Sequence, residues 1–289
     1  MDKLIDMHVH TNYSDGEFSP DDVIKRAIDA GIGTMAITDH DTISGVRSVD
    51  RNKDFIRESG IKVVNGIEIS AHSDTGTMHI LGYDFDLESS SLNRMLEELK
   101  TNRINSTIAV LEQIRRDYGI TFSYSDIIDL INSRHVCRPA LAKLCVKYGF
   151  SDSRNDAFVN FLNPAKEKTR KYDKNIFYPE CFKLVKDAGG IVILAHPKTL
   201  KLNNYDLDKL VHNMKEYGLD GIEVYNSVHT NSDVLFYTEL ASRYNLLVSG
   251  GSDFHGPSVK PDIEIGTGYG NIKIKSLSLV DELKRRNSI

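Results

Sequence analysis

The chain has 289 residues, 40% of them hydrophobic and 27% charged, which is the composition of a globular protein with one large domain or two ordinary ones. Its net charge of −5 argues against bulk binding of nucleic acid, and its three cysteines, none in CxxC spacing, predict neither a disulfide framework nor a cysteine-based zinc site. Because residues 1–7 resemble no secretory signal and no stretch approaches the ~18 apolar residues that span a bilayer, we expect a cytoplasmic protein without a membrane partner.

The first part of the chain alternates apolar runs with helical patterns. One helix is well marked, because Ser19 can cap it, Pro20 suits its first position and Gly31 ends it. The apolar runs on either side are short and continuous, as in strands that are buried on both faces. The predicted ranges are strands at 4–10, 33–41, 61–70 and 78–86 and helices at 19–31 and 43–59.

This alternation stops at Ser91. Residues 91–175 carry 15 Lys/Arg against 10 Asp/Glu, whereas the rest of the chain carries 21 against 31. We predict a basic, all-helical insertion at 91–175 that caps the substrate, between two parts of a larger domain, 1–90 and 176–289. Its expected pieces are a helix that Gly119 ends, shorter helices near 125–132, 138–148 and 152–162, and a basic connection at 163–175 that is either a substrate lid or an ordinary charged loop.

Alternation resumes after the insertion. The two parts of the chain outside the insertion together hold six or seven βα units in about 200 residues, fewer than the ~250 that a (β/α)8 barrel usually takes. A shortened or distorted barrel is therefore expected, with a doubly wound open sheet as the alternative; neither GxGxxG nor GxxxxGK[ST] occurs. The predicted ranges are helices at 178–188, 206–217 and 230–244 and strands at 191–197, 219–226 and 245–255.

Histidines and acids gather where these strands end. The carboxyl ends of parallel strands meet at one rim, so side chains that are far apart in sequence are expected to converge there. Imidazole and carboxylate are typical ligands of zinc, manganese and iron, and nine ligands are too many for one ion. The set predicts two or three divalent metal ions with a shared carboxylate. Its members are His8, His10, Asp15, His40, Glu68, His79, His196, Asp253 and His255.

Other residues near these motifs have alternative or supporting roles. A single histidine on an apolar strand is more often structural than a ligand, and His79, at the start of its predicted strand, has His72 as a competitor. Glu223 is either a ligand or an acid that orients a ligand histidine. Orienting roles are also expected for Asp6, Asp39 and Asp41, and no site role is assigned to His135, His212 and His229.

Six motifs, taken together, resemble those of one known family. The PHP family, named for polymerase and histidinol phosphatase, has a similar series in the same order, and the helical insertion resembles the branch of 3',5'-nucleotide bisphosphate phosphatases and short-RNA 5'-exonucleases. The motifs are "DMHVHTNYSDG", "AITDHD", "GIEIS", "HILGY", "ILAHP" and "GGSDFH". The resemblance implies a distorted (β/α)7 barrel with three metal ions, commonly Mn, Fe or Zn.

The resemblance also implies which residues share each ion. One ion would take His8, His10, Glu68 and Asp253. A second would share Glu68 and add His79 and His196. The third would take Asp15, His40 and His255.

The expected chemistry is hydrolysis of a phosphoester. Metal ions lower the pKa of bound water to about 7, so hydroxide would attack phosphorus at neutral pH, and Asp253 is our candidate for proton transfer. Arg138, just before a predicted helix, is a candidate for holding a second phosphate, and the resemblance supports that role. Lys198 and Lys201 are weaker candidates, because the nucleotide phosphatases of this branch tend to carry an arginine there.

The sequence therefore predicts a metal-dependent phosphoesterase that removes a terminal phosphate from small phosphorylated nucleotides. A 3',5'-nucleotide bisphosphate is the preferred substrate, with short oligoribonucleotides as a further one and no long nucleic acid as partner. A histidinol-phosphate phosphatase is the alternative within enzymes. An inactive metal-binding PHP scaffold is the alternative outside them.

Overall fold

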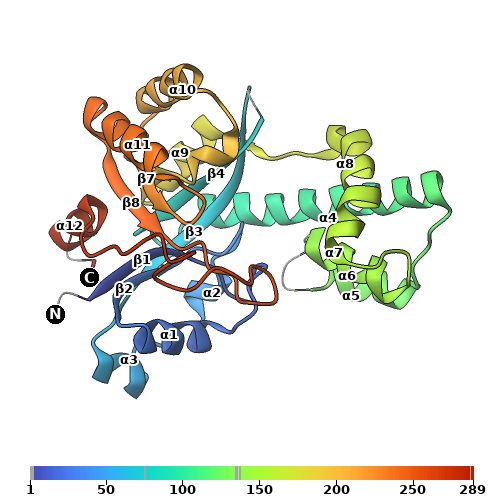
Figure 1. The fold of residues 1–289 in the computed structure, drawn as a ribbon, viewed down its shortest axis with the longest axis horizontal. Coiled ribbons are helices and arrows are strands. Elements are labelled where there is room, and N and C mark those ends of the chain that lie inside the picture. The colour runs from blue at the N-terminus through green and yellow to red at the C-terminus, as the bar shows by residue number, and fades with distance from the viewer. Residues whose placement is uncertain (1–2, 75, 134–135, 137, 287) are drawn as a thin grey trace. The chain divides into compact units, whose positions relative to one another are not determined.

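The computed structural model describes the chain except for residues 1–2, 75, 134–135, 137 and 287, and it divides into two compact units (Figure 1). The first, called the barrel unit below, combines Met1–Asn93 with Ile176–Ile289. The second, the helical unit, is Arg94–Asn175. Each unit is described separately.

Seven strands of the barrel unit follow one another around a distorted barrel, which confirms the predicted fold class. Hydrogen bonds between the end of β1 and the segment after β8 close it: the His10 amide donates to the Phe254 carbonyl at 2.9 Å, and the Asp253 amide to the His8 carbonyl at 2.8 Å. A short strand, β5 (Ile176–Phe177), pairs with β3 outside this order. The barrel strands are β1 (Leu4–Val9), β2 (Ile32–Ile37), β3 (Lys62–Ser73), β4 (Gly76–Tyr83), β6 (Ile191–Leu194), β7 (Gly221–Asn226) and β8 (Leu247–Gly251).

The expectation of parallel strands throughout is wrong for β4. This strand runs antiparallel to both β3 and β6, with Ser70 opposite His79. Only two residues separate β3 from β4, and a parallel pairing needs a crossover of a dozen or more. The reversal puts His79, near the beginning of β4, at the same end of the barrel as the carboxyl ends of the parallel strands.

Helices of the barrel unit lie in the connections between strands, except α12, which follows the last strand. As predicted, the Ser19 side chain caps α1 by accepting a hydrogen bond from the Asp22 amide at 3.2 Å. The single helix expected at 43–59 is wrong: it is two short helices, because Asp50 accepts a hydrogen bond from the Asn52 amide and turns the chain between them. The helices are α1 (Pro20–Asp29), α2 (Ser44–Arg47), α3 (Asp54–Ser59), α9 (Tyr178–Asp187), α10 (Asn204–Glu216), α11 (Asn231–Arg243) and α12 (Ser278–Arg285).

The helical unit has an apolar core of its own, built around buried residues such as Ile114, Leu141 and Leu162. The connection expected at 163–175 is wrong in its first part, where α8 and a 3₁₀ turn replace a loop. No helix in the described ranges is both long and apolar enough to cross a membrane. The helical elements are α4 (Ser90–Tyr118), α5 (Tyr124–Ile131), α6 (Arg138–Lys147), α7 (Arg154–Ala157), the π-helical turn η1 (Phe158–Leu162), α8 (Asn163–Thr169) and η2 (Arg170–Tyr172).

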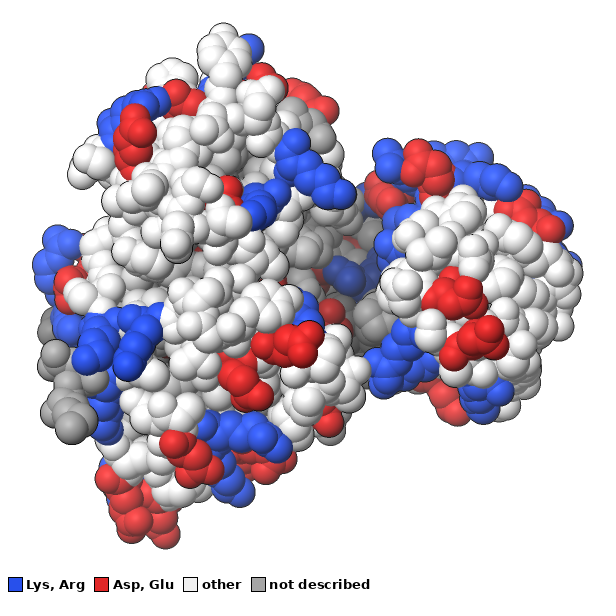
Figure 2. All heavy atoms as spheres, viewed as in Figure 1, with Lys and Arg blue, Asp and Glu red and all other residues white. Residues whose placement is uncertain are grey.

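Charged side chains of both signs are interspersed over the visible face of each unit (Figure 2). The positive balance of the insertion therefore does not form one continuous basic surface on the face shown. Such mixing is typical of an ordinary solvated protein surface.

Candidate metal centre

The centre begins at the end of β1, where His8 and His10 point to one face because side chains alternate along a strand. Both rings are fully buried. Asp6, also buried, accepts hydrogen bonds from the Ser252 amide at 2.8 Å and hydroxyl at 2.6 Å, which ties β1 to the segment before Asp253. Gly251 permits this approach, since a Cβ there would lie 2.3 Å from the His8 amide nitrogen. The first strand and the segment after β8 thus meet at the first histidine pair.

Glu68 on β3 lies at the middle of the imidazole group and divides it between its two oxygens. Its Oε2 lies 3.2 Å from His8 Nε2, 3.1 Å from His10 Nε2 and 3.1 Å from His40 Nδ1. Its Oε1 lies 2.9 Å from His79 Nδ1 and 2.8 Å from His196 Nε2. A carboxylate in this position can serve two neighbouring cations, one on each oxygen.

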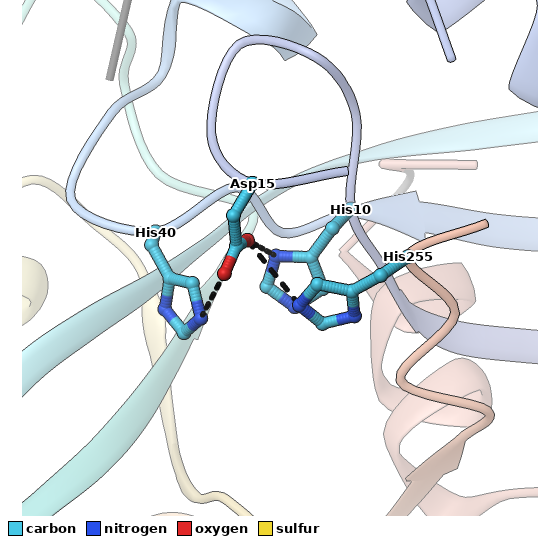
Figure 3. A group of neighbouring side chains, drawn as sticks. All are labelled: His10, Asp15, His40 and His255. Atoms are coloured by element: carbon cyan, nitrogen blue, oxygen red, sulfur yellow. Dashed lines mark ion pairs between the residues drawn. The ribbon is translucent and has the colours of Figure 1, made fainter. Parts of the chain in front are cut away.

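A second cluster surrounds Asp15, which reaches out of the loop after β1 (Figure 3). Its Oδ1 lies 3.2 Å from His255 Nε2 and 3.8 Å from His10 Nδ1, and its Oδ2 lies 3.9 Å from His40 Nε2. Asp39 anchors this loop by accepting hydrogen bonds from the Thr11 amide at 2.8 Å and hydroxyl at 2.7 Å. The Asp39 carboxylate therefore supports the loop without entering the cluster.

Asp253 completes the cluster at β1, where its Oδ1 lies 3.3 Å from His10 Nε2 and 3.7 Å from His8 Nε2. Asp253 and His196 have positive φ angles of 57° and 21°, a conformation rarely adopted by residues other than glycine. Backbone of this kind costs about 1–3 kcal/mol per residue and is found mainly where the surrounding structure enforces it at functional sites. His255 donates from Nδ1 to the Asp253 carbonyl at 2.9 Å, which leaves its Nε2 for Asp15.

A further layer of polar groups orients the histidines. Glu223 on β7 accepts from His8 Nδ1 at 2.9 Å and from the His196 amide at 2.7 Å. Thr199 lies 2.9 Å from His196 Nδ1 through its hydroxyl oxygen. The Nδ1 atoms of His8 and His196 are therefore hydrogen-bonded to these groups, and their Nε2 atoms face Glu68 at the centre. Partners of this kind fix the ring orientation of histidines that bind metals.

The electrostatic balance keeps the carboxylates ionised. Burial alone would raise the pKa of Glu68, but the imidazoles of His40, His79 and His8 outweigh it and hold that pKa well below its usual range. Burial would likewise lower the pKa of His10, whereas the adjacent carboxylates of Asp253 and Glu68 raise it to about 9. Because metal ions bind neutral imidazole, a cation that binds His10 must therefore displace a proton from its ring.

The residues present fit divalent cations. Buried nitrogens of His8, His10 and His79 face inward without hydrogen-bond geometry to any described group, as do one oxygen each of Asp15 and Glu68. Within each of three groups, one candidate ligand atom per residue lies within 4.8 Å of the others. The groups are His8, His10, Glu68 and Asp253; His10, Asp15, His40 and His255; and His40, Glu68 and His79.

The two cationic side chains that are candidates for binding phosphate each contact another side chain of their own unit. Lys198 donates to Asp233 at 2.6 Å, near the start of α11. Arg138, in the helical unit, donates to Asn163 at 2.5 Å and lies over the Phe158 ring, while its buried Nε has no hydrogen-bond partner among the described residues. Sequence reasoning missed Lys260, whose ammonium lies 2.6 Å from Asp253 Oδ2. No spacing signal marks a lysine that follows its partner by seven residues in a loop.

The histidines without an assigned site role lie outside the three groups. His72 is exposed beside Phe177, and His212 lies beside Tyr244. His229 is buried and donates from Nδ1 to the Val224 carbonyl at 2.9 Å. His135 lies outside the described residues.

Comparison with known proteins places the chain in a family. The model of the PHP domain matches residues 6–172, more than half of the chain. The chain belongs to the PHP domain family. A 5'-3' exoribonuclease from Haemophilus influenzae is 30% identical over 98% of this chain and 97% of its own length. A 3',5'-nucleoside bisphosphate phosphatase from Chromobacterium violaceum is 26% identical, over 88% and 87%.

A solved structure extends the similarity from the sequence of this chain to its fold. A candidate metal-dependent phosphoesterase from Bifidobacterium adolescentis has a TM-score of 0.71 and 29% identity, over 87% of each chain. With this family and this cluster of imidazoles and carboxylates, the protein is a metal-dependent phosphoesterase and hence a hydrolase. The alternative of an inactive scaffold is set aside.

Proposed function

We propose that this phosphoesterase removes a terminal phosphate from small phosphorylated nucleotides, with 3',5'-nucleotide bisphosphates as its best substrates and short oligoribonucleotides as further ones. The observation that carries the proposal is the division of Glu68 between two sets of imidazoles, which suits adjacent divalent cations. The similarity to a bisphosphate phosphatase and to an exoribonuclease supports the nucleotide class.

The proposed ligands are the nine side chains of the sequence-derived set, with two or three ions of Mn, Fe or Zn. Bound divalent cations supply a water of lowered pKa and neutralise the charge that develops on the phosphoryl oxygens. The chain orients these ligands through Glu223, Thr199 and Asp39. Asp253, whose Oδ1 faces His8 and His10, is the residue we propose for transfer of the proton of the attacking water.

A second phosphate needs a cation, and we propose Arg138 for it. Its guanidinium is held by Asn163 and Phe158, and its buried Nε is left for another acceptor. Lys198 is the weaker candidate, because its ammonium already pairs with Asp233. A guanidinium presents several N–H donors to a phosphate in a fixed geometry, which suits Arg138 for this role.

The substrate class is tested by measuring phosphate release in manganese from four compounds: a 3',5'-bisphosphate, a nucleoside monophosphate, a 5'-phosphorylated short oligoribonucleotide and histidinol phosphate. The bisphosphate should give the highest kcat/KM. His10→Ala and Asp253→Asn should abolish the release from it. Full activity in both variants would contradict the proposed site, and a preference for histidinol phosphate would contradict the substrate.

Arg138→Ala tests the second-phosphate role. Loss of a hydrogen bond to a charged group costs about 1.5–3 kcal/mol, so KM for the bisphosphate should rise about tenfold or more. KM for the monophosphate should stay within about twofold. Arg115→Ala, at an exposed ion pair with Glu112 in α4 of the same unit, is the control. An equal loss on both substrates would remove Arg138 from this role.

A further inference from the structure

Lys260 lies beside the candidate metal centre and pairs with the Asp253 oxygen that is not the one near His8 and His10. Its ammonium is 2.6 Å from Asp253 Oδ2, whereas Oδ1 of the same carboxylate is the atom near His8 and His10. About 33% of the lysine side chain is exposed, against 11% for Asp253. The two oxygens of one proposed ligand therefore face two different cationic surroundings.

The turn that carries Lys260 is held in place. The Lys260 amide donates to the Gly256 carbonyl at 2.9 Å, and the Ser258 amide donates to Glu17 Oε2 at 2.8 Å. Gly256 has φ +94°, and a Cβ there would lie 2.6 Å from that of Glu17. The Glu17 amide in turn donates to the His255 carbonyl at 2.7 Å. Lys260 is thus supported by the same loops that carry Asp15 and His255.

From this geometry we propose that Lys260 is a positioning residue: it holds Asp253 Oδ2, so that Asp253 presents only Oδ1 to the metal ions. The inference rests on the proposed function, because it assumes that Asp253 is a ligand. Hydrogen bonds to ligating carboxylates and histidines set their orientation, and loss of such a partner costs about 10–100-fold in metal affinity or activity. The charge-assisted bond offsets the rotamer entropy lost by the lysine.

The same lysine could instead contact the substrate directly, because part of its side chain is exposed. The two roles make different demands on kinetics. If Lys260 contacted a phosphate of the substrate, its loss would mainly raise KM. A positioning role would change the coordination of the metal itself and lower kcat, since the ligand atoms would be rearranged in the absence of any substrate.

The experiment uses the full chain with Co²⁺, whose visible absorption depends on the number and arrangement of its ligands. Lys260→Met should change the intensity of this spectrum without substrate, because Asp253 gains a second oxygen free to bind, and should lower kcat about 10–100-fold with KM within about twofold. Lys260→Arg keeps a donor and should restore both the spectrum and most of kcat. Lys186→Met is the matched control, since Lys186 pairs with Asp220 at the start of β7, at the opposite end of the strands.

An unchanged Co²⁺ spectrum in Lys260→Met would overturn the inference, whether KM rises or not. Failure of Lys260→Arg to restore the spectrum would also overturn it, provided that circular dichroism shows a folded protein. If Lys260→Met does not fold, Lys260→Leu, which also lacks a donor, replaces it with the same expected results. A wild-type protein that neither binds Co²⁺ nor releases phosphate would overturn the proposed function, and this inference with it.

Discussion

The barrel unit and the helical unit bury different kinds of side chain. In the barrel unit, the acids Asp6, Glu68 and Glu223 are fully buried. In the helical unit the core is apolar, and ion pairs such as Lys168–Asp117, at 2.8 Å, remain at the surface. Buried charges are costly unless partners or metal ions compensate for them, whereas exposed pairs contribute at most about 1 kcal/mol. The buried carboxylates of the barrel unit agree with the candidate metal centre there, whereas the core of the helical unit serves its stability.

The largest effect is expected for Glu68→Gln. An amide would bring N–H donors against imidazole nitrogens and could not serve two cations, so phosphate release should fall on the order of 10³-fold. Bound metal per chain, measured by elemental analysis, should fall as well. Glu88→Gln, at an exposed pair with Arg47, is the control. A variant with full metal content and activity would break the contrast between the units.

Ile114→Ala is expected to destabilise the helical unit only. Ile114 is fully buried in that core, and such truncations cost about 2–5 kcal/mol. Hydrogen exchange should accelerate in 94–175 while amides of the barrel strands stay protected. Ile108→Ala, at a position 40% exposed on the same helix, should change little. Uniform loss of protection in both units would show that they unfold together.

A smaller effect is expected for Glu223→Gln, which keeps the size of the side chain. The hydrogen bond from His8 Nδ1 would meet an amide in place of a carboxylate, so activity should fall about 10–100-fold. Metal affinity, measured by titration calorimetry, should weaken over the same range. Unaltered affinity and activity would mean that Glu223 has only a packing role.

The smallest effect concerns Asp126 in the helical unit. Hydrogen bonds from Lys147 and Tyr148 lower its pKa to about 2. A carboxyl whose pKa is lowered on folding contributes stability above its unfolded pKa of about 3.9 and loses it as the pH falls towards the folded value. Asp126→Asn should therefore lower the melting temperature of this unit slightly at pH 7. The difference from wild type should shrink as the pH is lowered from 5 towards 3, and a constant difference would contradict the assignment.

Local patterns explain how much of the site could be predicted. His8 and His10 share a face because residues two apart on a strand always do, and Asp253 and His255 follow a strand with the same spacing. The family motifs extended the prediction from these pairs to all nine candidate ligands. That these residues bind metal ions remains a prediction. The antiparallel direction of β4 escaped prediction because the parallel βα pattern was extended to this strand, although its two-residue connection to β3 is too short for a parallel crossover.

Supporting contacts were harder to predict than the candidate ligands. The sequence placed Glu223 at a strand end, but its two partners, His8 and the His196 amide, come from β1 and from the segment after β6. Lys260 lies in a loop without periodicity, and its contact with Asp253 depends on a turn held by Glu17. The helix α8 was missed because its run of charged residues is also typical of a loop.

By itself, the sequence determined the alternation of strands and helices, the helical character of 91–175 and the nature of the donor atoms, because hydrophobic periodicity and residue chemistry are local properties. The tertiary structure alone decided that Glu68 divides its oxygens between two imidazole sets and that Lys260 takes the outer oxygen of Asp253. Glu68 and His196 are 128 positions apart in the sequence, and the supporting contact between Asp6 and Gly266 spans 260 positions. Only the closure of the barrel brings such residues within hydrogen-bonding distance.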